Sequence, residues 1–190
     1  MGLECRFKLN GKPVSHLVCK SLGLNMPAFS GQRSCVNDPE TTFVESVGPI
    51  PLGLYYIVDR PKGGGMQKYK DVVYDWASDT RHADWFGLFK EDGLVDDYTQ
   101  TKGTYGRWKE GTNLIHYVGP EFGGHVEKVV NPRRGNFRLH PVGYFGISEG
   151  CITLFQKEQF YQLREHLVRQ PYEVIPATQI RTYGAVIVER

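Results

Sequence analysis

Glycine and proline constrain the fold of this sequence more than any other feature. The 190 residues include 22 Gly and 11 Pro, which divide the chain into short segments rich in β-branched and aromatic residues. Such breaks suit the ends of strands and interrupt long helices. The pattern predicts a mainly β protein with one helix and long decorating loops. The length favours a single domain over 1–190.

Residues 1–27 are expected to form an N-terminal hairpin, with strands at 3–9 and 14–19. The Asn10-Gly11 pair between them tolerates positive φ and is typical of a hairpin turn. Two registers remain open. A three-residue loop would place Cys5 opposite Cys19, whereas a two-residue loop would place Cys5 beside Val18. Further strands are expected at 54–58, 85–89, 114–118, 172–175 and 181–188.

The segment at about 61–135 is irregular and polar, and we interpret it as a loop-rich insertion or lid. Its Gly63-Gly-Gly65 run has neither the G-x-G-x-x-G spacing nor the Walker lysine of a phosphate loop, so a flexible linker is the better interpretation.

One helix is predicted late in the chain. The segment Thr153-Leu-Phe-Gln156 has the form of a capping box, and Phe160, Leu163 and Leu167 follow at helical spacing. Pro171 would end the helix. We therefore expect the helix to begin just after Cys151.

Composition excludes several classes of protein. The balance of 23 Lys+Arg against 21 Asp+Glu gives a net charge of +2, which predicts no nucleic-acid partner. A hydrophobic share of 40% excludes intrinsic disorder. Charges at Glu4, Arg6 and Lys8 argue against a signal peptide, and no apolar run approaches the roughly 20 residues of a membrane span.

The candidate chemistry lies between residues 134 and 152. Cys151 follows Ser148-Glu-Gly150, and His140 lies a short distance upstream. An imidazole can take the proton of a thiol nucleophile, and the N-terminus of the expected helix would favour the thiolate. Gly150 would allow a tight turn whose amides face a developing oxyanion. Ser148 would hold that turn or touch the substrate.

These residues resemble the His…S-x-G-C signature of the L,D-transpeptidases of the YkuD type. Ala28-Phe-Ser-Gly31 and the segment 48–57 resemble two further elements of that family in the same order, so the likeness covers about residues 28–170. Thr153 stands where typical members carry Arg, and His140 precedes Cys151 by only 11 positions. In these two features the sequence is more similar to the type VI secretion L,D-transpeptidase effectors than to typical members of the family.

The resemblance implies an L,D-transpeptidase-like β-sandwich or barrel that modifies peptidoglycan stem peptides. Cys151, deprotonated by His140, would attack the diaminopimelate carbonyl and release D-Ala. Water would then give L,D-carboxypeptidase activity, and a free D-amino acid would give exchange. Arg138 and Tyr144 are candidate substrate-binding residues, and no metal or other cofactor is expected.

The same resemblance implies where the protein acts and with what. It would be made in the bacterial cytoplasm without a signal peptide, secreted, and active in the periplasm of a target cell. Its partners would be stem peptides, D-amino acids or water, a cognate immunity protein and a component of the secretion machine.

Two alternatives remain. The chain could be a catalytically silent peptidoglycan-binding module, or a cysteine peptidase or amidase of another fold, although such enzymes usually place Cys before His. The four cysteines lack the C-x-x-C spacing of a structural zinc site, and His116 with His125 has no clear metal spacing. A Cys5–Cys19 or a Cys19–Cys35 disulfide, or three reduced thiols, are all open.

Overall fold

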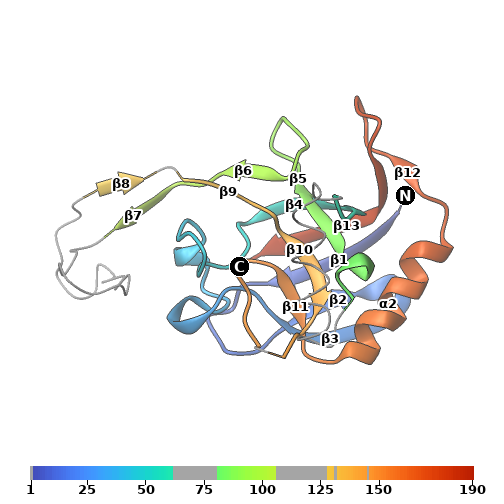
Figure 1. The fold of residues 1–190 in the computed structure, drawn as a ribbon, viewed down its shortest axis with the longest axis horizontal. Helices are drawn as coiled ribbons and strands as arrows, with labels where there is room; N and C mark the ends of the chain where they lie inside the picture. The colour runs from blue at the N-terminus through green and yellow to red at the C-terminus, as the bar shows by residue number, and fades with distance from the viewer. Residues whose placement is uncertain (1, 62–80, 106–127, 131, 145) are drawn as a thin grey trace.

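The computed structural model describes residues 2–61, 81–105, 128–130, 132–144 and 146–190. Its main sheet contains nine strands in the order β1-β2-β3-β11-β10-β5-β4-β13-β12, and β1 also pairs with β13. This second pairing closes the sheet into a barrel, with β12 attached outside the ring (Figure 1). The mainly β fold predicted from the glycine and proline pattern is confirmed.

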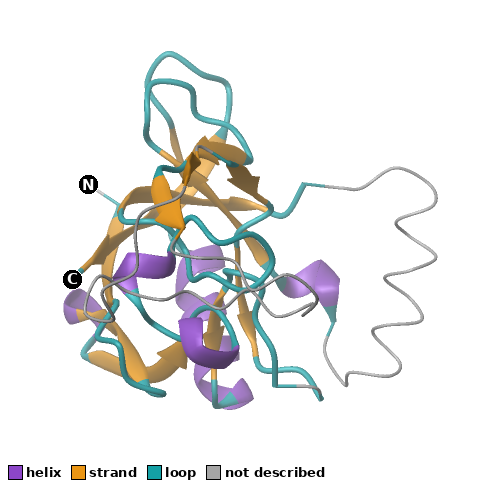
Figure 2. Cartoon of the chain, turned by 90° about the vertical axis from the view of Figure 1, so that its left-hand side faces the viewer, coloured by secondary structure: helices purple, strands orange, loops and turns teal. Residues whose placement is uncertain are grey.

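The strands of the main sheet are β1 (Leu3–Lys8), β2 (Ser15–Cys19), β3 (Leu24–Phe29), β4 (Gly53–Asp59), β5 (Phe86–Lys90), β10 (Arg138–Pro141), β11 (Ile152–Leu154), β12 (Glu173–Val174) and β13 (Arg181–Glu189). Short 3-10 turns lie at Lys20–Leu22 (η1), Arg33–Cys35 (η2), Pro39–Thr41 (η3) and His82–Asp84 (η4). The strands curve around a shared interior rather than lying in one plane (Figure 2).

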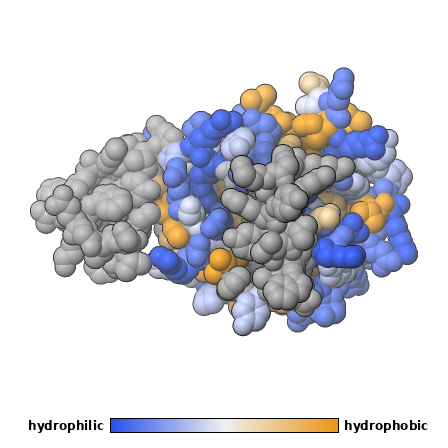
Figure 3. Space-filling model, in the orientation of Figure 1, coloured by the Kyte–Doolittle hydropathy of each residue, from blue (hydrophilic) through white to orange (hydrophobic). Residues whose placement is uncertain are grey.

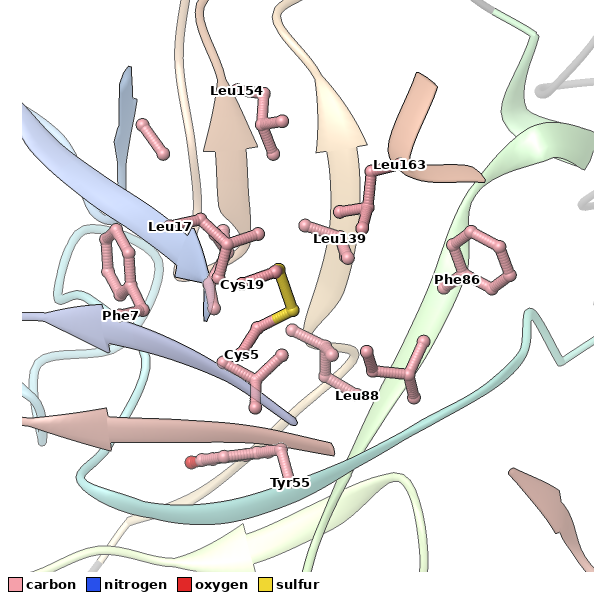
Figure 4. Packing of buried hydrophobic residues seen from close by; sticks show 14 of the residues in the cluster. Cys5, Phe7, Leu17, Cys19, Tyr55, Phe86, Leu88, Leu139, Leu154 and Leu163 are labelled. Atoms are coloured by element: carbon pink, nitrogen blue, oxygen red, sulfur yellow. A yellow bond between two sulfur atoms is a disulfide. The ribbon is translucent and has the colours of Figure 1, made fainter. Parts of the chain in front are cut away.

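The N-terminal hairpin forms as predicted, and its register is now defined. Arg6 lies opposite Val18 and Phe7 lies opposite Leu17, which is the pairing of the three-residue loop. Cys5 and Cys19 consequently meet in a disulfide with a Cα–Cα distance of 4.2 Å. Both cysteines are fully buried. Figure 4 shows the disulfide within the apolar interior of the barrel, so it is part of the core.

The helix lies where the apolar spacing placed it but begins later than predicted. Helix α2 spans Lys157–Arg169 and buries Phe160, Leu163 and Leu167. Ile152–Leu154, expected to lead directly into the helix, forms strand β11 between β3 and β10 instead. Pairing with two neighbours outweighs a local capping pattern. The helix N-terminus is therefore a full strand away from Cys151, and the predicted support of the thiolate by that terminus is wrong.

Two short ribbons extend from the barrel as an arm (Figure 1). Strand β6 (Tyr98–Gln100) pairs with β9 (Arg133–Gly135), and β7 (Gly103–Tyr105) pairs with β8 (Lys128–Val130). Strand β5 belongs to the barrel, although it falls within the segment that we interpreted as an insertion. The predicted Gly63–Gly65 linker, the strand at 114–118, His116 and His125 all lie outside the described residues.

The described surface is predominantly hydrophilic in the view of Figure 3, with small separate hydrophobic areas. Among the described residues, none of the helices has the length and apolar character needed to cross a membrane.

Candidate active site

The turn that carries Cys151 depends on Gly150 and Ser148. Gly150 has a φ of +109°, and a Cβ built on it would lie 2.6 Å from Nη2 of Arg134. A side chain is therefore excluded by both conformation and space. The Ser148 hydroxyl donates a hydrogen bond of 2.8 Å to the carbonyl of Cys151 and holds the turn closed. Gly150 and Ser148 thus shape the turn before Cys151, and their catalytic roles stay predictions.

The sulfur of Cys151 lies between backbone groups of the neighbouring segment. The thiol donates to the carbonyl of Asn136 at 3.8 Å, and the backbone N–H of Arg138 hydrogen-bonds the sulfur. Asn136 itself has a φ of +58°, which turns the chain at the start of β10. These groups can hold both a thiol and a thiolate.

Burial raises the pKa of the Cys151 thiol to about 11. The hydrogen bond from the Arg138 N–H and the positive charges of Arg138 and Arg134 lower the pKa, while the carboxylate of Glu149 raises it. Burial prevails, because a charged sulfur loses more hydration than these groups replace. Cys151 is therefore a protonated thiol in the resting protein at neutral pH.

His140 is buried on β10, with only 6% of its surface exposed. Its Nδ1 lies 2.8 Å from the carbonyl of Pro141, and its Nε2 lies 3.3 Å from the hydroxyl of Thr153. A carbonyl can only accept, so Nδ1 carries the proton and Nε2 accepts from Thr153. Trp85 stacks on the imidazole at 4.0 Å with an interplanar angle of 15°.

Burial is also the main reason why the pKa of His140 falls to about 4. The bond to the Pro141 carbonyl opposes this shift, whereas the nearby His82 ring and the positive charges of Arg138 and Arg60 add to it. The imidazole is therefore neutral at physiological pH, with an unprotonated Nε2 that can act as a base.

Cys151 lies directly before β11, and His140 lies on the neighbouring strand β10. Strands β10 and β11 are parallel, with His140 paired to Thr153 and Leu139 paired to Ile152. Cys151 precedes Ile152 and so lies level with Arg138, two positions from His140. Within the described part of the chain, neither imidazole nitrogen has the sulfur as a hydrogen-bond partner. Catalytic hydrogen bonds in enzymes without substrate are often long or incomplete.

Arg134 and Ser30 join the three sequence elements that suggested the family. The Arg134 guanidinium donates to the carbonyls of Pro49 (2.6 Å), Gly48 (2.8 Å), Glu149 (3.3 Å) and Thr42. The Ser30 hydroxyl donates to the Gly150 carbonyl at 3.1 Å and accepts from the Ile50 N–H at 2.8 Å. The end of β3, the loop before β4 and the cysteine turn therefore meet at one point.

The two predicted substrate-binding residues have different surroundings. Arg138 forms a bidentate ion pair with Asp97, at 2.5 and 2.7 Å, and its side chain is only 10% exposed. This pair holds the segment before β6 against β10. Tyr144 is 80% exposed on the loop that follows β10. Substrate contact by either residue stays a prediction.

A hollow of about 370 Å³ opens beside Cys151. Its lining includes Cys151, Asn136, Arg133, Arg134, Glu45 and Glu149. The residue Cys151 is partly exposed, so a ligand in this hollow can reach the thiol. Among the described residues, no group of three or more His, Cys, Asp or Glu side chains is arranged to hold a metal ion.

Thr153 and Trp85 contact the His140 imidazole, and the Asn136 carbonyl accepts from the Cys151 thiol, although the sequence did not indicate these neighbours. Thr153 belongs to a segment with the form of a capping box, a pattern that gives no sign of the contact between its hydroxyl and His140. Trp85 lies 55 positions before His140, too far along the chain for a local pattern to connect the two residues. Only the alternation of Arg138 and His140 on one strand face signalled a polar site there.

The fold and site define a closed β protein in which a reachable thiol precedes β11 and a neutral histidine lies on the adjacent parallel strand β10. A family model described as the Tlde1 domain matches residues 25–110 and 115–178. The chain belongs to this family of type VI secretion effectors of the L,D-transpeptidase kind. No curated protein and no solved structure matches the chain.

Proposed function

We propose that the protein is a cysteine-dependent enzyme that cuts or exchanges the terminal D-amino acid of peptidoglycan stem peptides. The observation that carries this proposal is the partly exposed Cys151 thiol at the hollow, next to a histidine whose basic Nε2 is fixed by Pro141 and Thr153. Membership of a family of the L,D-transpeptidase kind supports the proposed class of substrate.

Before substrate binds, the Cys151 thiol and the His140 imidazole are both neutral, so the proton must move as the sulfur attacks the substrate carbonyl. A thiol with a pKa near 11 does not give its proton to an imidazole with a pKa near 4 before substrate binds. As the sulfur forms its bond to the diaminopimelate carbonyl carbon, the proton passes to His140 Nε2, which gives up its bond from Thr153. His140 then acts as a general base rather than as half of a preformed ion pair.

The imidazolium next gives its proton to the nitrogen of the leaving D-Ala, and the C–N bond breaks to leave a thioester on Cys151. Water then attacks the thioester and yields a tripeptide, or the amine of a D-amino acid attacks and yields an exchanged tetrapeptide. In both cases His140 Nε2 takes a proton from the attacking group and passes it to the sulfur as the C–S bond of the thioester breaks, which restores the thiol and the neutral imidazole.

The proposed place of action is the periplasm of a target cell, reached through the secretion machine, where a cognate immunity protein would protect sibling cells. The buried Cys5–Cys19 disulfide supports this proposal, because disulfides persist in the periplasm and are rare in the cytosol.

The test compares the wild type with Cys151→Ala on tetrapeptide muropeptides, with and without a D-amino acid, by mass spectrometry. The wild type is expected to yield tripeptides or exchanged tetrapeptides, and Cys151→Ala only background. Cys35→Ala is the matched control, because Cys35 is the other free cysteine and is buried. It should retain activity.

Equal product from the wild type and Cys151→Ala would exclude the thiol mechanism. Retention of both proteins on peptidoglycan without any product would favour a silent binding module. Cleavage at another bond of the stem peptide or the glycan linkage would favour a peptidase or amidase.

A further inference from the structure

Arg134 is a buried cation next to the cysteine turn. Arg134 is 5% exposed, and its guanidinium donates hydrogen bonds to four backbone carbonyls, including that of Glu149. No carboxylate of the described ranges lies within ion-pair distance of it. Carbonyl dipoles solvate a positive charge but leave its net value unchanged, and a buried charge without a counter-ion is costly.

The other arginines of this segment differ in that respect. Arg138 is neutralised by the bidentate pair with Asp97. Arg133 is mostly exposed, with Asp96 at 3.8 Å and the Tyr98 ring at 4.1 Å. Water and salt screen an exposed charge far more than a buried one. Among these three arginines, Arg134 is therefore the one whose charge is neither balanced by a described carboxylate nor screened by solvent.

The anion that would balance Arg134 is the thiolate of Cys151. Both residues line the same hollow, and Nη2 of Arg134 holds the carbonyl of Glu149, two positions before the cysteine. We propose that Arg134 is a positioning residue that stabilises the Cys151 thiolate as the thiol loses its proton. The inference deepens the proposed function and rests on it for the role of Cys151 as nucleophile.

The other charged and titratable groups around the two residues do not supply this balance. Arg138 favours the thiolate, but it is paired with Asp97, and Glu149 opposes the thiolate. Around the guanidinium lie Tyr55 of β4, Cys35 and Glu45. Burial keeps the pKa of Tyr55 well above its ordinary value, and its hydroxyl donates to the Pro51 carbonyl at 2.8 Å. Cys35 is buried away from reagents, and Glu45 is exposed and screened by water.

The test measures iodoacetamide alkylation of Cys151 at pH 8 by site-resolved mass spectrometry. Arg134→Gln should react about tenfold more slowly, because losing a neighbouring cation raises a thiol pKa by about one unit. Arg134→Lys keeps the charge and should stay within about threefold of the wild type. Arg133→Gln, which changes an exposed arginine lining the same hollow, should stay within about twofold.

Two controls separate the electrostatic role from a structural one. The Arg134→Gln deficit should persist between low and high salt, since the charge is buried. If Arg134 only braced the turn, both substitutions at Arg134 would lower the melting temperature and expose the thiol, and alkylation would become faster. That result, or a wild-type rate in Arg134→Gln, would overturn the proposal.

If Arg134→Gln does not fold, Arg134→Met replaces it as a neutral side chain of similar length and is judged by the same rate. Alkylation requires no stem peptide, so a deficit in Arg134→Gln would stand even if muropeptide turnover were absent. Absent turnover with a normal alkylation pattern would instead count against the proposed function alone.

Discussion

The two halves of the site are built differently. The thiol half is partly exposed, opens on a hollow and is surrounded by charged side chains. The imidazole half is buried, and His140 is covered by Trp85, which in turn contacts His82 at 4.1 Å. One half is accessible to substrate, and the other is shielded from water.

Electrostatics sharpen this contrast. Burial disfavours the charged form of both groups, raising the pKa of Cys151 and lowering that of His140. The charge of Arg138, however, favours a thiolate and disfavours an imidazolium, and Arg134 also favours the thiolate. The site therefore stabilises negative charge near the sulfur and leaves the positive charge on His140 transient. The same cations would favour the oxyanion of a tetrahedral intermediate.

The largest expected effect tests whether the halves are independent at rest. His140→Gln should lower turnover of tetrapeptide muropeptides by about 10²–10⁴-fold, because it removes the proposed general base. Alkylation of Cys151 by iodoacetamide should change less than about threefold, since the hydrogen bonds described for the sulfur and for the imidazole do not join the two groups. If His140→Gln lowered both muropeptide turnover and the alkylation rate of Cys151 to a similar extent, the two residues would form a thiolate–imidazolium pair before substrate binds.

A second effect concerns stability on the shielded side. The pKa of His140 falls from 6.5 in the unfolded chain to about 4 in the folded one, so only the unfolded chain binds a proton in that interval. The stabilisation is complete above pH 6.5 and is lost as the pH falls towards 4, by about 3 kcal/mol.

Urea unfolding at pH 7 and pH 4.5 measures this loss, with His140→Gln as the control. The control should lack the contribution of His140 and lose correspondingly less stability over the same interval. An identical pH dependence in both proteins would show that His140 is not the group that protonates.

Much of the framework could be predicted from the sequence because its signals are local. The hairpin at Asn10-Gly11, the strand after Leu52-Gly53 and the apolar face of α2 follow from turn chemistry and residue spacing. Cys151 and His140 followed from a motif that ties residue type to position. These features need no knowledge of distant partners.

The rest depends on pairing between distant segments. By its local pattern Thr153 belongs to a helix cap, but in the structure it lies on β11 between β3 and β10. Nothing near Arg138 in the sequence indicates its ion pair with Asp97, which comes from the segment before β6. The stack of Trp85 on His140 likewise depends on β5 lying beside β10. Such contacts follow from the closure of the barrel, which no local pattern specifies.

The smallest expected effect lies where the halves meet, at the Thr153 hydroxyl. Thr153→Val keeps the shape but removes the donor to Nε2. Because Nε2 gives up this bond when it takes the thiol proton, the loss of about 1 kcal/mol of ground-state stabilisation should raise kcat/KM by up to roughly fivefold. The lost bond favoured the neutral imidazole, so the pKa of His140 should rise and the acidic limb of the pH–rate profile should move to higher pH. Thr153→Ser keeps the hydroxyl and should retain both the rate and the limb. Equal changes in the two variants would show that the Thr153 hydroxyl is not the cause, and Thr153 would then have no part in tuning the basicity of His140.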